Sequence, residues 1–256
     1  MWCNIIFTIL RENRLHQAQP LKKGEGSMIK AVSFDIGHTL VRYSNPLNWK
    51  SSYEAALRKV FEECGIGLSD EGIKAATIIL SKYNTRENPR EIEVTSETIF
   101  NEILDVWGQP YDKLDIVREA FYGFFQADAV CYEDVVSTLR YLRVSGVKIG
   151  ALTDVAYGMD NSFALQDIAT VHQYFDLVLT SVDVGYRKPD IAGFSMLLKA
   201  FDASPSQMIY VGDEQKDIVG ANSLGIVSVL IDRSGSSPNW GQTHTVHALS
   251  DVCALI

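Results

Sequence analysis

The sequence is poor in cysteine, and its few cysteines form no pattern that binds a metal or builds a disulfide framework. They are Cys3, Cys64, Cys131 and Cys253, spread over 256 residues. No two of them form a C-x-x-C pair, and no group of cysteines and histidines has the spacing of a zinc site. We therefore expect reduced thiols and a cytoplasmic protein.

Long apolar runs are also missing, so we expect no membrane partner. The stretch from Trp2 to Leu10 is apolar, but a membrane-spanning helix needs about 20 such residues. It also lacks the preceding positive charge and the small-residue cleavage site of a signal peptide. Gly24–Met28 is what a purine-rich ribosome-binding sequence followed by a start codon would encode. We expect Met28 to be the natural start, and residues 1–27 to be an extension that is not native or is poorly ordered.

Positive charge is the third feature in short supply. The chain has 23 lysines and arginines against 32 aspartates and glutamates, a net charge of −9. A general nucleic-acid binder normally has a basic face, so we expect no nucleic-acid partner. A small phosphorylated ligand is compatible with this charge, because a local site can be positive on an acidic protein. The sequence alone leaves the oligomeric state open.

The order of apolar patterns along the chain predicts an α/β fold. Residues 29–35 have the apolar run of a buried strand, and predicted strands and helices alternate from about residue 129 onward. Such alternation is typical of a parallel sheet with right-handed crossovers. Further strands are predicted at 147–152, 177–180, 208–211 and 226–231, and helices at 133–145, 159–169, 190–201 and 215–224.

A helical block separates the first predicted strand from the others. Between residues 44 and 128, apolar residues recur at helical spacing. The pattern predicts four helices, which begin near Tyr53, at Ser69-Asp70, at Thr95-Ser96 and near Tyr111. We therefore divide the chain into an α/β core, residues 28–43 and 129–256, and an inserted, mostly helical domain, residues 44–128.

Four polar sites follow the predicted strands of the core. Asp35 ends the first strand in SFDIGHTL, and Thr153 ends the second in GALTD. Lys188 lies in YRKPD just before a predicted helix, while Asp213 and Asp217 lie in VGDEQKD after another strand. Because the carboxyl ends of parallel strands meet at one edge of the sheet, we expect these side chains to converge.

In this order, the four sites resemble the motifs of the haloacid dehalogenase superfamily, a group rich in phosphatases. Its motifs are D-x-D-x-T/V, a Thr or Ser after an apolar strand, a Lys, and a sequence close to G-D-x-x-x-D. The resemblance covers residues 29–231. It implies a Rossmann-like parallel sheet with helices on both faces, and it identifies the helical insert as a cap carried between the first and second motifs.

By this resemblance, the protein is an Mg2+-dependent phosphomonoesterase of a small phosphorylated metabolite. Asp35 would be the nucleophile and form an aspartyl phosphate. Thr153 and Lys188 would be further catalytic groups that bind the phosphate, Thr153 through its hydroxyl and Lys188 through its charge. The amide of Asp154 and the side chain of His38 are additional candidates for phosphate binding.

The resemblance also implies a metal site. Mg2+ prefers hard oxygen ligands. Candidate ligands are Asp35, the backbone carbonyl of Gly37, Asp213 and Asp217. Asp217 and Glu214 are supporting acids, either of which would order a metal-bound water or hold the nearby lysine, and Glu214 is expected at the start of a helix without a direct metal bond.

Gly37 departs from the family pattern. In phosphatases of the family, an acid at this position protonates the leaving group and then activates water, a contribution of typically about 10²–10⁴ in rate. The adjacent His38 is one substitute, although a structural role is favoured for it. A substrate with a good leaving group, such as an acyl phosphate or an anomeric sugar phosphate, needs less help. An acid or base supplied by the cap is a third solution, with Glu91, Glu93, Tyr43 and Tyr53 as unranked candidates.

Two other functions stay open beside the phosphomonoesterase. One is a catalytically weak phosphate-binding or regulatory protein. The other is a hydrolase of the phosphonate or dehalogenase type. The dehalogenase pattern has a Tyr at the position of Gly37 and uses no Mg2+, so the pair Asp213 and Asp217 argues against it. A phosphonate hydrolase would need a Schiff-base lysine in the cap, for which the chain offers Lys50, Lys59, Lys74 and Lys82.

Overall fold

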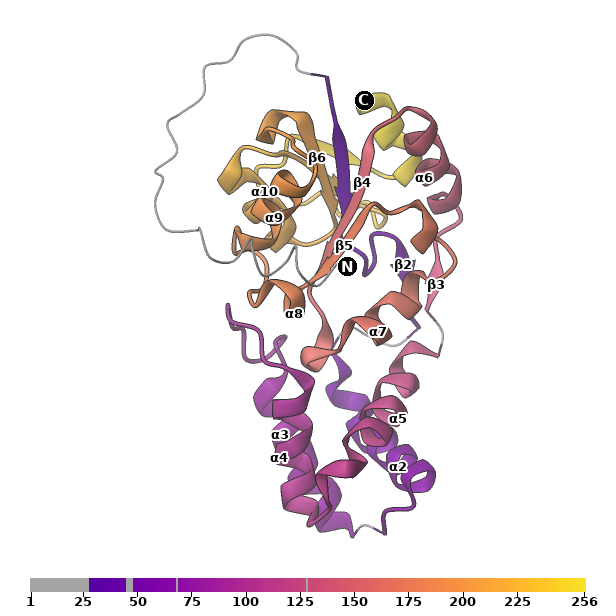
Figure 1. Cartoon of the computed structure of the whole chain (residues 1–256), viewed down its shortest axis with the longest axis vertical. Helices are drawn as coiled ribbons and strands as arrows, with labels where there is room; N and C mark the ends of the chain where they lie inside the picture. Colours follow the sequence, from indigo (N-terminus) through magenta and orange to yellow (C-terminus); the bar gives the residue numbers. More distant parts are fainter. Residues whose placement is uncertain (1–27, 45–47, 68, 128) are drawn as a thin grey trace.

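The computed structural model describes residues 28–256, apart from 45–47, 68 and 128. The predicted extension, residues 1–27, lies outside the described residues. The described chain forms an α/β core and a separate bundle of helices at one end of it, which we call the helical unit (Figure 1). No helix in these ranges is long and apolar enough to cross a membrane.

The core contains a six-stranded parallel sheet with the order β5-β4-β1-β6-β7-β8. Its first strand, β1, lies inside the sheet and is fully buried, as its apolar sequence AVSF predicts. The last strand, β8, was not predicted from the sequence, because it is only three residues long. The strands are β1 (Ala31–Phe34), β4 (Lys148–Thr153), β5 (Leu177–Thr180), β6 (Met208–Gly212), β7 (Val227–Ile231) and β8 (His244–Val246).

Helices cover both faces of this sheet, which confirms the predicted α/β fold (Figure 1). Alternate residues of a strand point to opposite faces. Val32 and Phe34 therefore pack with α6 and the C-terminal 3-10 helix, while Ala31 packs with α9 and α10. The core helices are α6 (Val135–Val144), α7 (Asn161–Ala164), α8 (Ser181–Val184), α9 (Ala192–Ala200), α10 (Gln215–Leu224) and the 3-10 helix Leu249–Leu255.

The helical unit has its own apolar core. Its helices are α2 (Tyr53–Cys64), α3 (Asp70–Tyr83), α4 (Ser96–Trp107) and α5 (Leu114–Gln126). Two of the predicted starts are confirmed by capping contacts, in which the side-chain oxygens of Ser69 and Thr95 accept hydrogen bonds from backbone amides in the first turns of α3 and α4. The fourth helix begins later than predicted, because a 3-10 turn occupies Tyr111–Lys113.

Two chain segments connect the core and the helical unit, and they run side by side. The short strands β2 (Val41–Arg42) and β3 (Val130–Cys131) pair antiparallel with each other, away from the main sheet. They fall close to the predicted domain boundaries. Strands of two residues leave no periodic pattern, so the sequence did not predict them.

The helix predicted at 159–169 is wrong in extent. The structure has only α7 there, followed by 3-10 turns. The physical reason lies in packing, because Val155, Tyr157, Met159 and Ala164 belong to the apolar core of the helical unit. The segment after β4 thus packs against the helical unit, and its irregular backbone directs these four apolar side chains into the apolar core of that unit.

Candidate active site

The predicted convergence of strand ends is present at the middle of the sheet. Strands β4 and β6 pair with the two sides of β1, so Phe34 lies beside Ala151 on one side and beside Val211 on the other. Asp35 comes directly after β1, and its amide donates to the Val211 carbonyl at 2.8 Å. Thr153 therefore follows on one side of Asp35, and the residues after Gly212 follow on its other side.

Lys188 reaches this edge from the loop between α8 and α9. Its Nζ lies 2.6 Å from Asp35 Oδ1 and 2.7 Å from Asp217 Oδ1. It also donates to the Leu152 carbonyl at 3.2 Å and to the Tyr210 hydroxyl at 3.3 Å. Complete burial by itself would lower the pKa of Lys188, but Asp217 and Asp35 outweigh that effect and raise it well above its usual value. The Lys188 side chain therefore stays protonated and positively charged as long as Asp35 and Asp217 are ionised.

Three carboxylates form a cluster that fits a divalent cation. Oxygens of Asp35, Asp213 and Asp217 all lie within 4.8 Å of one another. Burial first, and then the neighbouring carboxylates, raise the pKa of Asp213. Burial and Asp35 also raise the pKa of Asp217, against the attraction of Lys188, which lowers it. Lys188 balances only part of this negative charge. The set of hard oxygens with unbalanced charge is what Mg2+ requires.

Both carboxylate oxygens of Asp217 have protein partners. Its Oδ1 accepts from Lys188, and its Oδ2 accepts from the backbone amide of Glu214 at 3.0 Å. Of the two supporting roles considered for it, holding Lys188 is the one that these contacts favour. Glu214 is the N-cap residue of α10, and its carboxylate pairs with Arg86 and, at 2.9 Å, with Lys216.

The side chain of Asp154 turns away from Asp35 and toward cations and an amide. Its Oδ1 accepts from the Lys188 amide at 3.0 Å, and its Oδ2 lies 2.9 Å from Lys216 Nζ. Burial would raise the pKa of Asp154, but the attraction of Lys216, Lys188 and Arg187 lowers it to about 2. The Asp154 carboxylate therefore holds the loop that carries Lys188. Donation of a hydrogen bond from the Asp154 amide to the phosphate remains a prediction.

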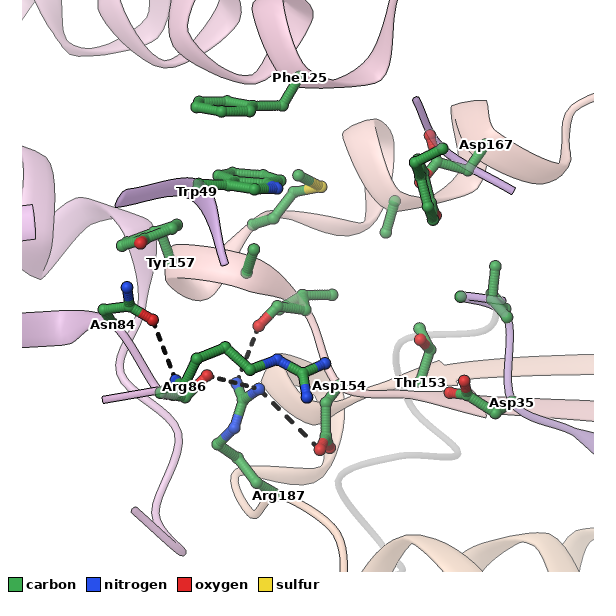
Figure 2. A pocket seen from close by; sticks show the side chains of 18 of the residues that line it. Asp35, Trp49, Asn84, Arg86, Phe125, Thr153, Asp154, Tyr157, Asp167 and Arg187 are labelled. Atoms are coloured by element: carbon green, nitrogen blue, oxygen red, sulfur yellow. Dashed lines mark hydrogen bonds and ion pairs between the residues drawn. The ribbon is translucent and has the colours of Figure 1, made fainter. Parts of the chain in front are cut away.

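A cavity of about 130 Å3 lies between the core and the helical unit. Asp35, Thr153 and Asp154 line it from the core, and Trp49, Asn84, Arg86 and Phe125 line it from the other side (Figure 2). Figure 2 shows the Arg86 guanidinium extended toward Thr153 and Asp35. Far from Asp35, the Trp49 ring stacks on Phe125 with centroids 3.8 Å apart. The cavity thus has a charged end, which contains both carboxylates and cations, and an aromatic end.

Comparison with known proteins agrees with this arrangement. The haloacid dehalogenase-like hydrolase family matches the chain over residues 55–231. The chain belongs to this family. It is therefore an enzyme of the hydrolase class, and the resemblance predicted from the four motifs is confirmed. The matched range begins after Asp35, so the identification does not depend on the segment that contains Gly37.

Curated relatives of this haloacid dehalogenase-like hydrolase include named phosphatases. The chain is 30% identical over 210 residues to a glyceraldehyde 3-phosphate phosphatase from Methanopyrus kandleri, covering 80% of this chain and 85% of that protein. It is 29% identical over 219 residues to a ribulose-1,5-bisphosphate 5-phosphatase from Halopiger xanaduensis, covering 82% and 87%.

Solved structures share the fold of this family member. A 2-haloacid dehalogenase from Pseudomonas syringae pv. Tomato DC3000 has a TM-score of 0.65 and 24% identity, with 89% of this chain and 98% of that chain covered. A HAD phosphatase from Thermococcus onnurineus has a TM-score of 0.61 and 22% identity, with coverage of 89% and 97%. Their names span two chemistries, so this likeness speaks for the fold alone.

Gly37 and His38 lie at the point where this hydrolase departs from the motif. A Cβ atom built on Gly37 would lie 3.8 Å from the Tyr43 ring, an ordinary contact. His38 has a positive φ of 53° and packs edge-on against Tyr43, with ring centroids 5.8 Å apart. Burial lowers the pKa of His38. It is not among the cavity-lining residues, so its phosphate-binding role remains a prediction.

The four candidates for the missing acid or base lie at different places in the structure. Tyr43 lines the cavity, but its hydroxyl donates to Asp167 Oδ2 at 2.7 Å, at the end far from Asp35 (Figure 2). Tyr53 is buried in the helical unit, where its hydroxyl pairs with that of Tyr157. Glu91 is exposed, and Glu93 is buried against Arg187. None of the four contacts Asp35.

Three cations that line the cavity were not predicted as site residues from the sequence. Arg187 stands beside Lys188 in YRKPD, and Lys216 lies within VGDEQKD, so both had a signal in their neighbours. Arg86 lies in a polar loop of the helical unit with no motif around it. Only the docking of that loop on the core brings it near Asp35.

Proposed function

We propose that this family member is an Mg2+-dependent phosphatase of a small phosphorylated metabolite and that it acts through an aspartyl phosphate on Asp35. The observation that carries the proposal is the assembly of Asp35, Lys188 and Asp217 at the sheet edge, with Asp213 beside them. Relatives named as phosphatases of ribulose 1,5-bisphosphate and glyceraldehyde 3-phosphate support it.

In this proposal, Asp35 is the nucleophile, and Lys188 and Thr153 bind the phosphoryl group. An oxygen of Asp35 attacks the phosphorus atom, and the bond between phosphorus and the leaving-group oxygen breaks. Water next attacks the phosphorus of the aspartyl phosphate, which releases phosphate and restores the carboxylate. The Lys188 ammonium and the Thr153 hydroxyl hold phosphoryl oxygens during both reactions. Among the described residues, no protein group bonds to the Thr153 hydroxyl, so it is free to donate.

The metal would be held by Asp35, Asp213, the carbonyl of Gly37 and, directly or through water, Asp217. When bound, Mg2+ supplies positive charge against the repulsion between the phosphate and the Asp35 carboxylate. The residues themselves keep this arrangement rigid. Asp35 is held through its amide by Val211, and Asp213 Oδ1 accepts from the Thr39 hydroxyl at 3.3 Å.

We further propose that the helical unit, within the predicted limits 44–128, is a cap that reads the leaving group. It supplies Trp49, Asn84, Arg86 and Phe125 to the cavity. Since no acid stands at Gly37, the enzyme favours substrates whose leaving group departs without a proton.

The phosphonate alternative has less support. All four candidate lysines of the helical unit are at least partly exposed, and none lines the cavity. They are Lys50, Lys59, Lys74 and Lys82. A catalytically weak phosphate-binding protein is the second candidate, because Gly37 removes the group that normally assists turnover in the family pattern.

The test is phosphate release from phosphomonoesters, sugar 1-phosphates and acyl phosphates, with Mg2+ and with EDTA. We expect Mg2+-dependent turnover in the wild type and its loss in Asp35→Asn. Asp112→Asn, an exposed carboxylate of the helical unit, is the matched control and should keep wild-type turnover. Phosphate binding without turnover on any substrate would favour the binding protein, and turnover that survives in Asp35→Asn would disprove the nucleophile.

A further inference from the structure

The loop between α3 and α4, residues 84–95, docks on the chain just before Lys188. We call it the docking loop. Its backbone forms an antiparallel bridge in which Ile92 faces Tyr186. The Glu93 amide donates to the Gly185 carbonyl at 3.0 Å, and the Arg187 amide donates to the Glu91 carbonyl at 2.8 Å. The residue that precedes the lysine is therefore hydrogen-bonded to the helical unit rather than to the sheet.

Side chains reinforce this backbone contact with a buried ion pair. The Glu93 side chain is 2% exposed and the Arg187 side chain 7% exposed. Glu93 Oε2 accepts from the Arg187 guanidinium and, at 2.5 Å, from the Ser181 hydroxyl of α8. The same guanidinium donates to the Val155 carbonyl after β4 at 2.8 Å. One carboxylate of the helical unit thus joins two separate segments of the core.

The path from Glu93 to the nucleophile is short and continuous. Arg187 and Lys188 are adjacent, so the contacts that hold Arg187 also fix the backbone position from which the Lys188 side chain extends. The Lys188 amide is held from the other side by Asp154 at 3.0 Å. Its side chain is 1% exposed and ends 2.6 Å from Asp35. A shift in the backbone at Arg187 would move the ammonium away from both Asp35 and Asp217.

We infer that Glu93 is a positioning residue, which places Lys188 against Asp35 by clamping Arg187 when the docking loop is seated. Docking of the helical unit and completion of the phosphate-binding site are then one event. The catalytic consequence rests on the proposed function, in which Lys188 holds the phosphate. The placement of Lys188 does not rest on it and can be measured by itself.

The experiment compares Glu93→Gln with Glu87→Gln in the full chain. Glu87 lies in the same loop but pairs with Lys50 of the helical unit at 2.9 Å, so its loss leaves the core untouched. A crystal structure of each variant gives the distance from Lys188 Nζ to Asp35. We expect it to lengthen beyond hydrogen-bond range only in Glu93→Gln. A lysine that stays in contact with Asp35 in that variant would overturn the inference.

Kinetics give the second readout. In Glu93→Gln, kcat should fall about 10- to 100-fold, by the same factor for every substrate, because Lys188 contacts the phosphoryl group and not the leaving group. Arg86→Ala, in the same loop, should instead raise KM more than it lowers kcat, because its guanidinium lines the cavity and pairs with Glu214. A loss of thermal stability with kcat unchanged below the unfolding transition would mean a merely structural role, and would also overturn the inference.

A double variant distinguishes the placement of Lys188 from the neutralisation of Arg187. It is also the variant to use if an unpaired Arg187 prevents Glu93→Gln from folding. Glu93→Gln combined with Arg187→Gln removes both charges of this pair and leaves Arg90, which contacts Glu93 Oε1 at 2.9 Å, as in the single variant. A low kcat and a displaced lysine in this variant support the inference, whereas a full return to wild-type kcat shows that Glu93 only neutralises Arg187. If wild-type protein itself fails to turn over any phosphate ester, the proposed function fails, but the Lys188 distance still decides the role of Glu93.

Discussion

At the scale of single residues, the site is a balance of buried charges. Asp35, Asp213 and Asp217 face one lysine, so the cluster keeps negative charge that a bound cation would offset. Buried charges are costly when they lose a partner. Each substitution at this edge therefore changes its neighbours as well as itself.

Gly37 offers the sharpest residue-scale prediction. Its φ is not in the left-handed range, and a Cβ there meets only the Tyr43 ring at 3.8 Å, so Gly37→Asp can be accommodated. The new carboxyl group would stand where the family pattern has its acid. We expect kcat on substrates with poor leaving groups to rise by about tenfold or more, a part of the range for general acid–base catalysis.

The control for this substitution is Gly37→Asn, which has the same shape and no proton to transfer in this role. The measurement is kcat for a series of phosphate esters of graded leaving-group acidity. Dependence on the leaving group should be steep in the wild type and in Gly37→Asn, and flatter in Gly37→Asp. Equal slopes in all three proteins would mean that another group already supplies the proton.

At the scale of elements, the segment after β4 determines how the helical unit sits on the core. Gly158 has a positive φ of 62°, and a Cβ built there would lie 2.1 Å from the Val94 carbonyl oxygen and 2.5 Å from the Ser96 amide. These atoms belong to the docking loop and the start of α4. The close approach of two backbones explains why a glycine is needed here.

Gly158→Ala should therefore destabilise the contact between the core and the helical unit. The methyl group overlaps backbone atoms and the residue keeps a strained φ, which together cost about 2–4 kcal/mol. Thermal unfolding and limited proteolysis of the docking loop measure the effect. Gly123→Ala is the matched control, since a Cβ on that glycine of α5 meets nothing within 4 Å and alanine favours a helix. Equal stability of the two variants would contradict the expectation.

At the scale of the whole molecule, Asp134 ties the C-terminal part to the rest of the core. Its carboxylate accepts from Arg233 at 3.0 Å and from the Leu249 amide at 2.7 Å. Arg233 also lies over the Tyr132 ring, 3.8 Å from its centroid. One acid thus links the start of α6, the segment after β7 and the C-terminal 3-10 helix.

Asp134→Asn should destabilise the protein in a pH-dependent way. Burial would raise the pKa of Asp134, but the hydrogen bonds from Arg233 and Leu249 lower it below its usual value. Because the folded-state pKa lies below that of the unfolded chain, the stabilisation is complete near neutral pH and is lost as the pH falls below about 4. We expect a loss of about 1–3 kcal/mol at pH 7.

Chemical denaturation at pH 7 and at pH 3 measures this difference. Asp112→Asn, an exposed substitution, should change stability little at either pH. The difference between wild type and Asp134→Asn should shrink in acid. A constant difference over this range would show that shape, and not ionised Asp134, provides the contact.

The α/β class, the starts of α3 and α4, and the residues at the strand ends could all be predicted from the sequence. Strand periodicity, capping residues and motif order are local signals, and parallel pairing brings the carboxyl ends together wherever the strands lie. Asp35, Thr153, Lys188 and Asp213 could thus be predicted as neighbours. Their roles in phosphate and metal binding remain predictions.

The side chains that face these residues from the helical unit could not be predicted in this way. The irregular segment after β4 and the contacts of Arg86, Glu93 and Arg187 arise between elements far apart in the chain, where a polar loop of the helical unit meets the core. Such contacts depend on the relative placement of two packed bodies, and no periodicity along the chain encodes that placement. The residues at the carboxyl edge of the sheet can therefore be predicted from the sequence, whereas the residues of the helical unit that face this edge cannot.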